Sequence, residues 1–186
     1  MDETTPSTTS ALMLPGWMGS GPAHWQSLWE ARHGDRRVEQ DDWELPVREE
    51  WTARLDEALR AEASPAVLVA HSLGCHLVAA WAAAAHDPRR VRAALLVAPP
   101  DIGREDMPPL LHGWRRIPGG ALPFPSLVVA SNDDPYCTLA AARAMATGWG
   151  AGLVDAGARG HLNAESGLGD WPQGRDLLAR LVARAG

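Results

Sequence analysis

Short apolar runs that alternate with helix-forming segments constrain the fold of this chain more than any other feature. Four runs contain only Ala, Val, Leu and Met, as is typical of strands buried in a parallel sheet, and they cover residues 11–14, 66–70, 93–98 and 127–130. Two weaker runs, residues 37–40 and 152–154, are expected to form edge strands.

The segments between these runs carry apolar residues at helical spacing. The i, i+4 interval recurs in four groups: Trp25 and Trp29; Trp51, Leu55 and Leu59; Leu73, Leu77 and Trp81; and Leu177, Leu178, Leu181 and Val182. Alternating strands and helices predict right-handed crossovers and a three-layer α/β/α sandwich. We expect a mostly parallel six-stranded sheet in the order 2-1-3-4-5-6, with the proline-rich residues 99–125 as a long connection.

Length and charge exclude several classes of protein. The 186 residues fit one domain, which we place at residues 11–186 behind a flexible leader of residues 1–10. The net charge is −6 and no Lys is present, so neither nucleic-acid binding nor lysine chemistry is expected. There is no signal peptide and no membrane-length apolar run, which predicts a cytoplasmic protein without membrane contact. The two cysteines, Cys75 and Cys137, are expected to be reduced thiols.

A strand, a tight turn and a helix are expected to meet at His71-Ser72-Leu73-Gly74. A serine at such a turn exposes its hydroxyl, and the following helix N-terminus favours negative charge beside it. Ala70 stands where the usual G-x-S-x-G pattern has its first glycine. This context predicts Ser72 as a nucleophile, and the alternative is an ordinary helix N-cap.

A catalytic serine needs a histidine as base and a carboxylate that orients the histidine. In a sheet of this topology the acid follows a late strand and the base follows the last one. The fourth long apolar run leads into Asp133 and Asp134, and the last weak run leads into a polar loop with His161. Neighbours in an extended segment point to opposite sides, so only one of the two aspartates can meet His161. The other histidines are expected to have surface, capping or support roles: His24, His33, His71, His76, His86 and His112.

An acyl-transfer site also needs N–H donors for the developing oxyanion. Leu73, directly after Ser72, supplies one candidate, and Trp17 supplies the other from residues 14–21, where three glycines let the chain bend over the site. This turn matches no nucleotide-binding glycine pattern, so no cofactor is expected. The histidines lie on separate segments without ligand spacing, so no metal site is expected.

Four stretches, in order along the chain, carry a more specific pattern: residues 14–26 (LPGWMGSGPAHWQ), 69–75 (VAHSLGC), 131–136 (SNDDPY) and 160–174 (GHLNAESGLGDWPQG). Together they resemble the small serine hydrolases of the retinoblastoma-binding-protein-9 and YdeN type, a branch of the α/β-hydrolase superfamily. The resemblance implies a reduced α/β-hydrolase fold without a large lid and assigns Ser72, Asp134 and His161 as the triad. Related hydrolases place the acid last in a G-x-x-D pattern, and Asp134 occupies that position although Ser131 replaces the glycine.

These observations predict a serine hydrolase that cleaves a small ester, thioester or activated amide through an acyl-serine intermediate, without a cofactor or metal. Its partner would be a small-molecule substrate. Two alternatives are a non-catalytic binding protein with the same fold and an acyltransferase that uses the same triad. The sequence indicates neither the acyl-chain preference nor the oligomeric state.

Overall fold

The computed structural model describes residues 10–84, 87–117 and 119–186, which build one parallel sheet. All five strand pairings are parallel, and the order β2-β1-β3-β4-β5-β6 confirms the predicted one. The strands are β1 (Ala11–Leu14), β2 (Arg36–Arg37), β3 (Ala66–His71), β4 (Val91–Val97), β5 (Ser126–Ala130) and β6 (Gly152–Asp155).

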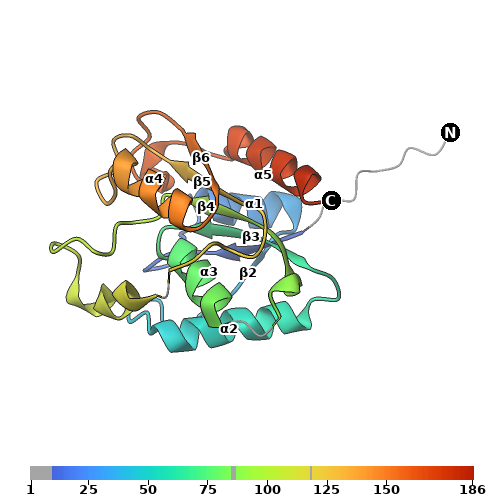
Figure 1. Cartoon of the computed structure of the whole chain (residues 1–186). Coiled ribbons are helices and arrows are strands. Elements are labelled where there is room, and N and C mark those ends of the chain that lie inside the picture. The colour runs from blue at the N-terminus through green and yellow to red at the C-terminus, as the bar shows by residue number, and fades with distance from the viewer. Residues whose placement is uncertain (1–9, 85–86, 118) are drawn as a thin grey trace.

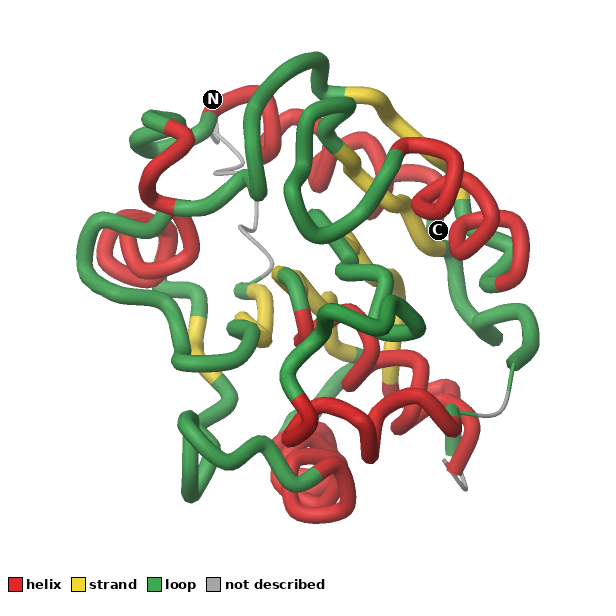
Figure 2. Tube along the Cα trace, turned by 90° about the vertical axis from the view of Figure 1, so that its left-hand side faces the viewer, coloured by secondary structure: helices red, strands yellow, loops and turns green. Residues whose placement is uncertain are grey.

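Helices cover both faces of the sheet, which confirms the three-layer arrangement (Figure 1). One face carries α1 (Trp25–His33) and α5 (Pro172–Arg184), and the other carries α2 (Arg48–Ala61), α3 (Leu73–Ala84) and α4 (Leu139–Gly148). Figure 2 views the molecule from the left-hand side of Figure 1 and shows loops in front of the strands. The helical spacing did not predict α4, because its buried face consists of the small residues Ala142 and Ala146.

Side chains of each strand alternate between two hydrophobic clusters. In β3, Val67 and Val69 pack with α1 and α5, whereas Leu68 and Ala70 pack with α2 and α3. Because both faces are covered, every residue of this strand is buried, and the strand is apolar until its last residue. Tryptophans pack on both faces of the sheet, and five are fully buried: Trp25, Trp29, Trp51, Trp81 and Trp114.

The predicted edge strand at residues 37–40 is wrong in its bounds. Only Arg36 and Arg37 pair with β1, opposite Leu12 and Met13. The ladder ends there because β1 stops at Leu14 and is followed by Pro15, which has no N–H to donate.

The predictions for the N-terminal leader, His86, the two cysteines and membrane contact have different outcomes. The leader predicted over residues 1–10 lies outside the described residues except for Ser10, whose hydroxyl donates to the Gly34 carbonyl at 2.9 Å. His86 also lies outside them. Both cysteines are buried free thiols, as predicted. Among the described residues, no helix has the length and apolar character needed to cross a membrane.

The long connection between β4 and β5 includes a 3-10 helix, η2 (Pro109–Arg116). The indole N–H of Trp114 donates to the Pro46 carbonyl at 2.8 Å, and the Arg115 Nε donates to the Ile102 carbonyl at 2.8 Å. These bonds attach η2 to the loop before α2 and to the start of the connection. The segment is therefore a fixed part of the domain beside the strand ends.

The turn between β3 and α3 packs tightly against the end of β1. A Cβ atom added to Gly74 would lie 2.2 Å from the Leu14 carbonyl oxygen, far inside van der Waals contact. Only glycine lets the first turn of α3 approach β1 this closely.

We therefore expect Gly74→Ala to lower the free energy of unfolding by about 1–3 kcal/mol, the usual cost of overpacking. Urea denaturation measures the change. Gly113→Ala is the matched control, because a Cβ at Gly113 meets no atom within 4 Å. If the two variants unfold at the same urea concentration, the close approach of α3 to β1 is contradicted.

His76 couples the stability of α3 to pH. Its Nε2–H donates to the Pro100 carbonyl at 2.8 Å, and burial lowers its pKa from 6.5 to about 4. Between these two values the unfolded chain binds more protons, so this contribution is complete above pH 6.5 and is lost as the pH falls toward 4. We expect His76→Gln to reduce the pH dependence of the unfolding free energy in this window by up to about 1.4 kcal/mol per pH unit. Urea titrations between pH 4 and 7 test this, and an unchanged slope would refute it.

Candidate active site

The turn at Ser72 is held in an unusual backbone conformation. Ser72 has a φ of 54°, in the left-handed region, at the junction of β3 and α3. Its N–H donates to the Val97 carbonyl at 2.9 Å, which ties the turn to the end of β4. The strand, the turn and the helix thus have the geometry of a nucleophile elbow.

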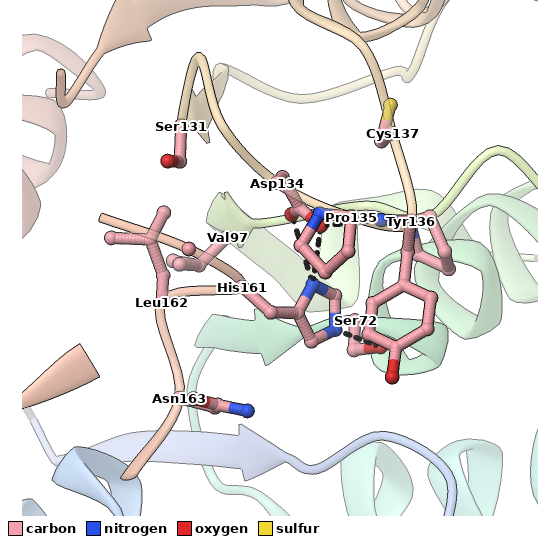
Figure 3. A network of polar contacts seen from close by, with 12 residues as sticks. Ser72, Val97, Ser131, Asp134, Pro135, Tyr136, Cys137, His161, Leu162 and Asn163 are labelled. Carbon is pink, nitrogen blue, oxygen red and sulfur yellow. Dashed lines mark hydrogen bonds and ion pairs between the residues drawn. The ribbon is translucent and has the colours of Figure 1, made fainter. Parts of the chain in front are cut away.

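Ser72, His161 and Asp134 are joined in one chain of hydrogen bonds (Figure 3). The Ser72 Oγ lies 2.9 Å from the His161 Nε2, and the His161 Nδ1 lies 2.9 and 3.1 Å from the two carboxylate oxygens of Asp134. A carboxylate only accepts, so Nδ1 carries the proton and Nε2 is the acceptor for the serine hydroxyl. The Asp134 and His161 side chains are only 2% and 10% exposed.

Asp133 forms hydrogen bonds with the surrounding loops and not with the His161 ring. It accepts hydrogen bonds from the Ser131 hydroxyl at 2.6 Å and from the Gly160 N–H at 2.7 Å. These two donors keep the pKa of its carboxyl below the ordinary value. Asp134 therefore lies against the imidazole, whereas Asp133 links the loops after β5 and β6.

The loop after β1 places the second candidate donor beside the elbow. A Cβ added to Gly16 would lie 2.8 Å from the Ser72 Cβ and 3.1 Å from the Leu73 N, so this loop contacts the turn directly. Trp17 and Leu73 both line the cavity above Ser72. Within the described parts of the chain, neither of their N–H groups has a hydrogen-bond partner. The two residues predicted to supply the oxyanion donors therefore line one cavity, and their donor role stays a prediction.

His71 has a closer relation to this site than the sequence indicated. Its Nε2–H donates to the main-chain carbonyl of His161 at 2.9 Å, which fixes the loop of the base to the residue before the serine. Burial, together with the neighbouring His24, holds the pKa of His71 well below 6.5. His24 caps α1 by accepting from the Gln26 N–H, and burial lowers its pKa to about 4. Both rings are neutral at pH 7, and the only sequence signal for His71 was its position next to Ser72.

Tyr136 is a second residue that the sequence analysis left without a role. Its ring stands edge-on to the His161 ring, with 4.7 Å between centroids, and is 47% exposed (Figure 3). Its N–H donates to the Asp134 Oδ1 at 2.8 Å. Tyr136 therefore covers the imidazole and supports the carboxylate, and its position two residues after Asp134 was the available signal.

A cavity of about 670 Å³ opens above Ser72. Residues from the loops after β1, β3, β4, β5 and β6 line it, and they include both candidate donors and the imidazole of His161. Its size is that of a small-molecule site.

The cysteines and the potential metal ligands near the site do not favour thiol or metal chemistry. Burial raises the pKa of the Cys137 thiol to about 12 and that of Cys75 well above its usual range, so neither is a thiolate nucleophile at pH 7. The described residues contain no group of three His, Cys, Asp or Glu side chains that could hold a metal ion.

Solved hydrolases share this architecture. A protein described as a YdeN-like hydrolase, from Pectobacterium atrosepticum, is 29% identical, with a TM-score of 0.84 over 95% of this chain and 91% of that chain. The ydeN gene product of Bacillus subtilis is 19% identical, with a TM-score of 0.72 over 94% and 99%. The carboxylesterase CesB from Bacillus subtilis is 14% identical, with a TM-score of 0.58 over 96% and 84%. No curated protein sequence matches the chain.

A family model described as "Serine hydrolase" matches residues 11–180, from the first residue of β1 into α5. The match includes the elbow and the loops that follow β5 and β6. The similarity to YdeN-like hydrolases points to the same group. The chain therefore belongs to the serine hydrolase family, as a small, esterase-like enzyme of the YdeN type with the α/β-hydrolase fold.

Proposed function

We propose that the protein hydrolyses small ester, thioester or activated-amide substrates through an acyl-serine intermediate on Ser72. The observation that carries this proposal is the continuous chain of hydrogen bonds from the Ser72 Oγ through His161 to Asp134 beneath the cavity. This arrangement can activate a hydroxyl that is otherwise a weak nucleophile at neutral pH.

In the first half of the reaction, the Ser72 Oγ attacks the substrate carbonyl carbon and its proton passes to the His161 Nε2. The carbonyl oxygen becomes an oxyanion, which the N–H groups of Leu73 and Trp17 stabilise. His161 then gives its proton to the leaving oxygen, sulfur or nitrogen as the bond to the carbonyl carbon breaks. The alcohol, thiol or amine departs and the acyl group remains on the serine.

In the second half, water attacks the acyl carbon and His161 accepts the proton of that water. The same two N–H groups stabilise the second oxyanion. His161 returns the proton to the Ser72 Oγ, the acyl-oxygen bond breaks and the carboxylic acid leaves. Asp134 keeps the imidazole in one tautomer and stabilises the imidazolium in both halves.

The nucleophile assignment predicts where a covalent probe reacts. A fluorophosphonate should label the peptide that contains Ser72, and Ser72→Ala should abolish both labelling and ester hydrolysis. Ser10→Ala, which lies outside the cavity, is the matched control and should label like the wild type. Labelling at Ser20 or Ser131 would refute the assignment. No labelling at all would favour the binding-protein alternative, and acyl transfer to an added alcohol in preference to water would favour the acyltransferase.

The two aspartates provide a matched pair of variants. Asp134→Asn places an amide against the Nδ1 of His161 and favours the wrong tautomer, so kcat should fall by about 10⁴. Asp133→Asn keeps an oxygen that can accept from Ser131 and Gly160, so its loss should be far smaller. The kcat values of both variants are measured on one ester, and circular dichroism checks that both are folded. A larger loss in folded Asp133→Asn would show that the acid is misassigned by one residue.

A further inference from the structure

We propose that the site takes uncharged esters and thioesters whose acyl group is a hydrocarbon chain of medium length. This inference rests on the acyl-serine mechanism proposed above and names a substrate class for it. The chain would lie on an apolar surface formed by Trp17, Met107 and Leu111, which we call the acyl wall.

The acyl wall is an apolar part of the cavity lining. Met107 and Leu111 are only 7% and 5% exposed, and they belong to the same hydrophobic cluster as Leu73. Trp17 packs against this cluster and also lines the cavity. The rest of the lining includes polar groups, among them imidazole, amide and carboxylate groups from His24, His71, Asn163 and Glu165.

The position of His161 determines where the acyl part and the alcohol part of an ester lie in the cavity. Its Nε2 must reach the leaving oxygen to protonate it, so the leaving group lies on the side of His161, with Asn163 and Glu165. The carbonyl oxygen points to the N–H groups of Trp17 and Leu73. The acyl substituent takes the remaining direction from the carbonyl carbon, and we place it against Met107 and Leu111, the buried apolar side chains that line the same cavity.

The acyl wall is formed before any substrate binds. Leu111 belongs to η2, which the hydrogen bonds of Trp114 and Arg115 attach to the rest of the domain. Trp114 itself is fully buried. A surface that is already ordered costs little conformational entropy when a chain binds to it, so its apolar area contributes directly to affinity.

The charges at the cavity favour an uncharged substrate. Arg104 lines the cavity, but it forms an ion pair with Asp106 and also donates to the Pro135 carbonyl. Glu165 lines the cavity and has no ion pair with any described residue. The local balance is therefore one negative charge, and the whole chain carries −6. A polyanionic carrier such as coenzyme A would be repelled.

The acyl wall is tested with p-nitrophenyl esters of acetate, butyrate, hexanoate and octanoate. Full burial of one methylene is worth about fourfold in kcat/KM, and we expect at least about a tenfold rise from acetate to hexanoate. Leu111→Phe places a larger side chain in the space expected to hold the acyl chain. It should lower the ratio of kcat/KM for hexanoate to kcat/KM for acetate by about tenfold. Leu110→Phe is the matched control, because Leu110 is 39% exposed and lines a separate groove, and it should leave the ratio unchanged.

Two further comparisons test whether the effect belongs to the acyl chain and not the alcohol chain, and whether substrate charge lowers the activity. Lengthening the alcohol of an acetate ester from ethyl to hexyl should leave kcat/KM nearly unchanged. The uncharged thioester of hexanoate with N-acetylcysteamine should be cleaved at least about tenfold more efficiently than hexanoyl-coenzyme A.

The possible results separate this inference from the proposed function. Wild-type activity on acetate without a rise toward hexanoate would overturn the acyl wall and leave the acyl-serine mechanism standing. The same follows if the rise tracks the alcohol chain, if coenzyme A esters are preferred, or if folded Leu111→Phe keeps the wild-type ratio. Should Leu111→Phe fail to fold, the wild-type series decides alone. Absence of a Ser72 adduct would overturn the mechanism itself.

Discussion

The close approach of the elbow to the end of β1 is the constraint on which the rest of the site depends. Gly74 lies against the Leu14 carbonyl, and Gly16 lies against Ser72 and the Leu73 N–H. Side chains at either glycine would push the first loop away from the elbow. This contact joins the loop that carries Trp17 to the turn that carries Leu73, the two residues whose N–H groups we propose as oxyanion donors. It also explains why Ser72 keeps a strained backbone conformation with φ of 54°.

The parallel sheet gathers the remaining groups because all of its strands end at the same edge. Asp134 follows β5 and His161 follows β6, and Asp133 joins their loops through the Gly160 N–H. His71 adds a link from the end of β3 to the His161 carbonyl. The imidazole is thus held through its ring and through its backbone. Such support keeps catalytic groups within the narrow range of positions that proton transfer requires.

Two neighbouring histidines add no positive charge beside His161, the proposed base. His24 and His71 lie close to the site, and burial lowers the pKa of both, so neither adds positive charge beside His161 at pH 7. On the far side of the cavity, the connection between β4 and β5 is a fixed wall, since Trp114 and Arg115 anchor it. This anchored segment contributes Met107 and Leu111 to the cavity lining, beside the loops that follow the other strands.

The sequence alone determined the strands, the turn at Ser72, and the loops that carry Asp134 and His161, because apolar runs, turn residues and helical spacing are local signals. The strand order was predictable only because α/β sheets of this kind share a common topology. It did not determine α4, whose buried face is alanine, or the true bounds of β2, which depend on where β1 ends. The roles of His71, Tyr136 and the wall around Leu111 were decided only by tertiary structure. Each depends on contacts between segments distant in the chain, such as the 90 residues that separate His71 from His161, and no local pattern encodes such contacts.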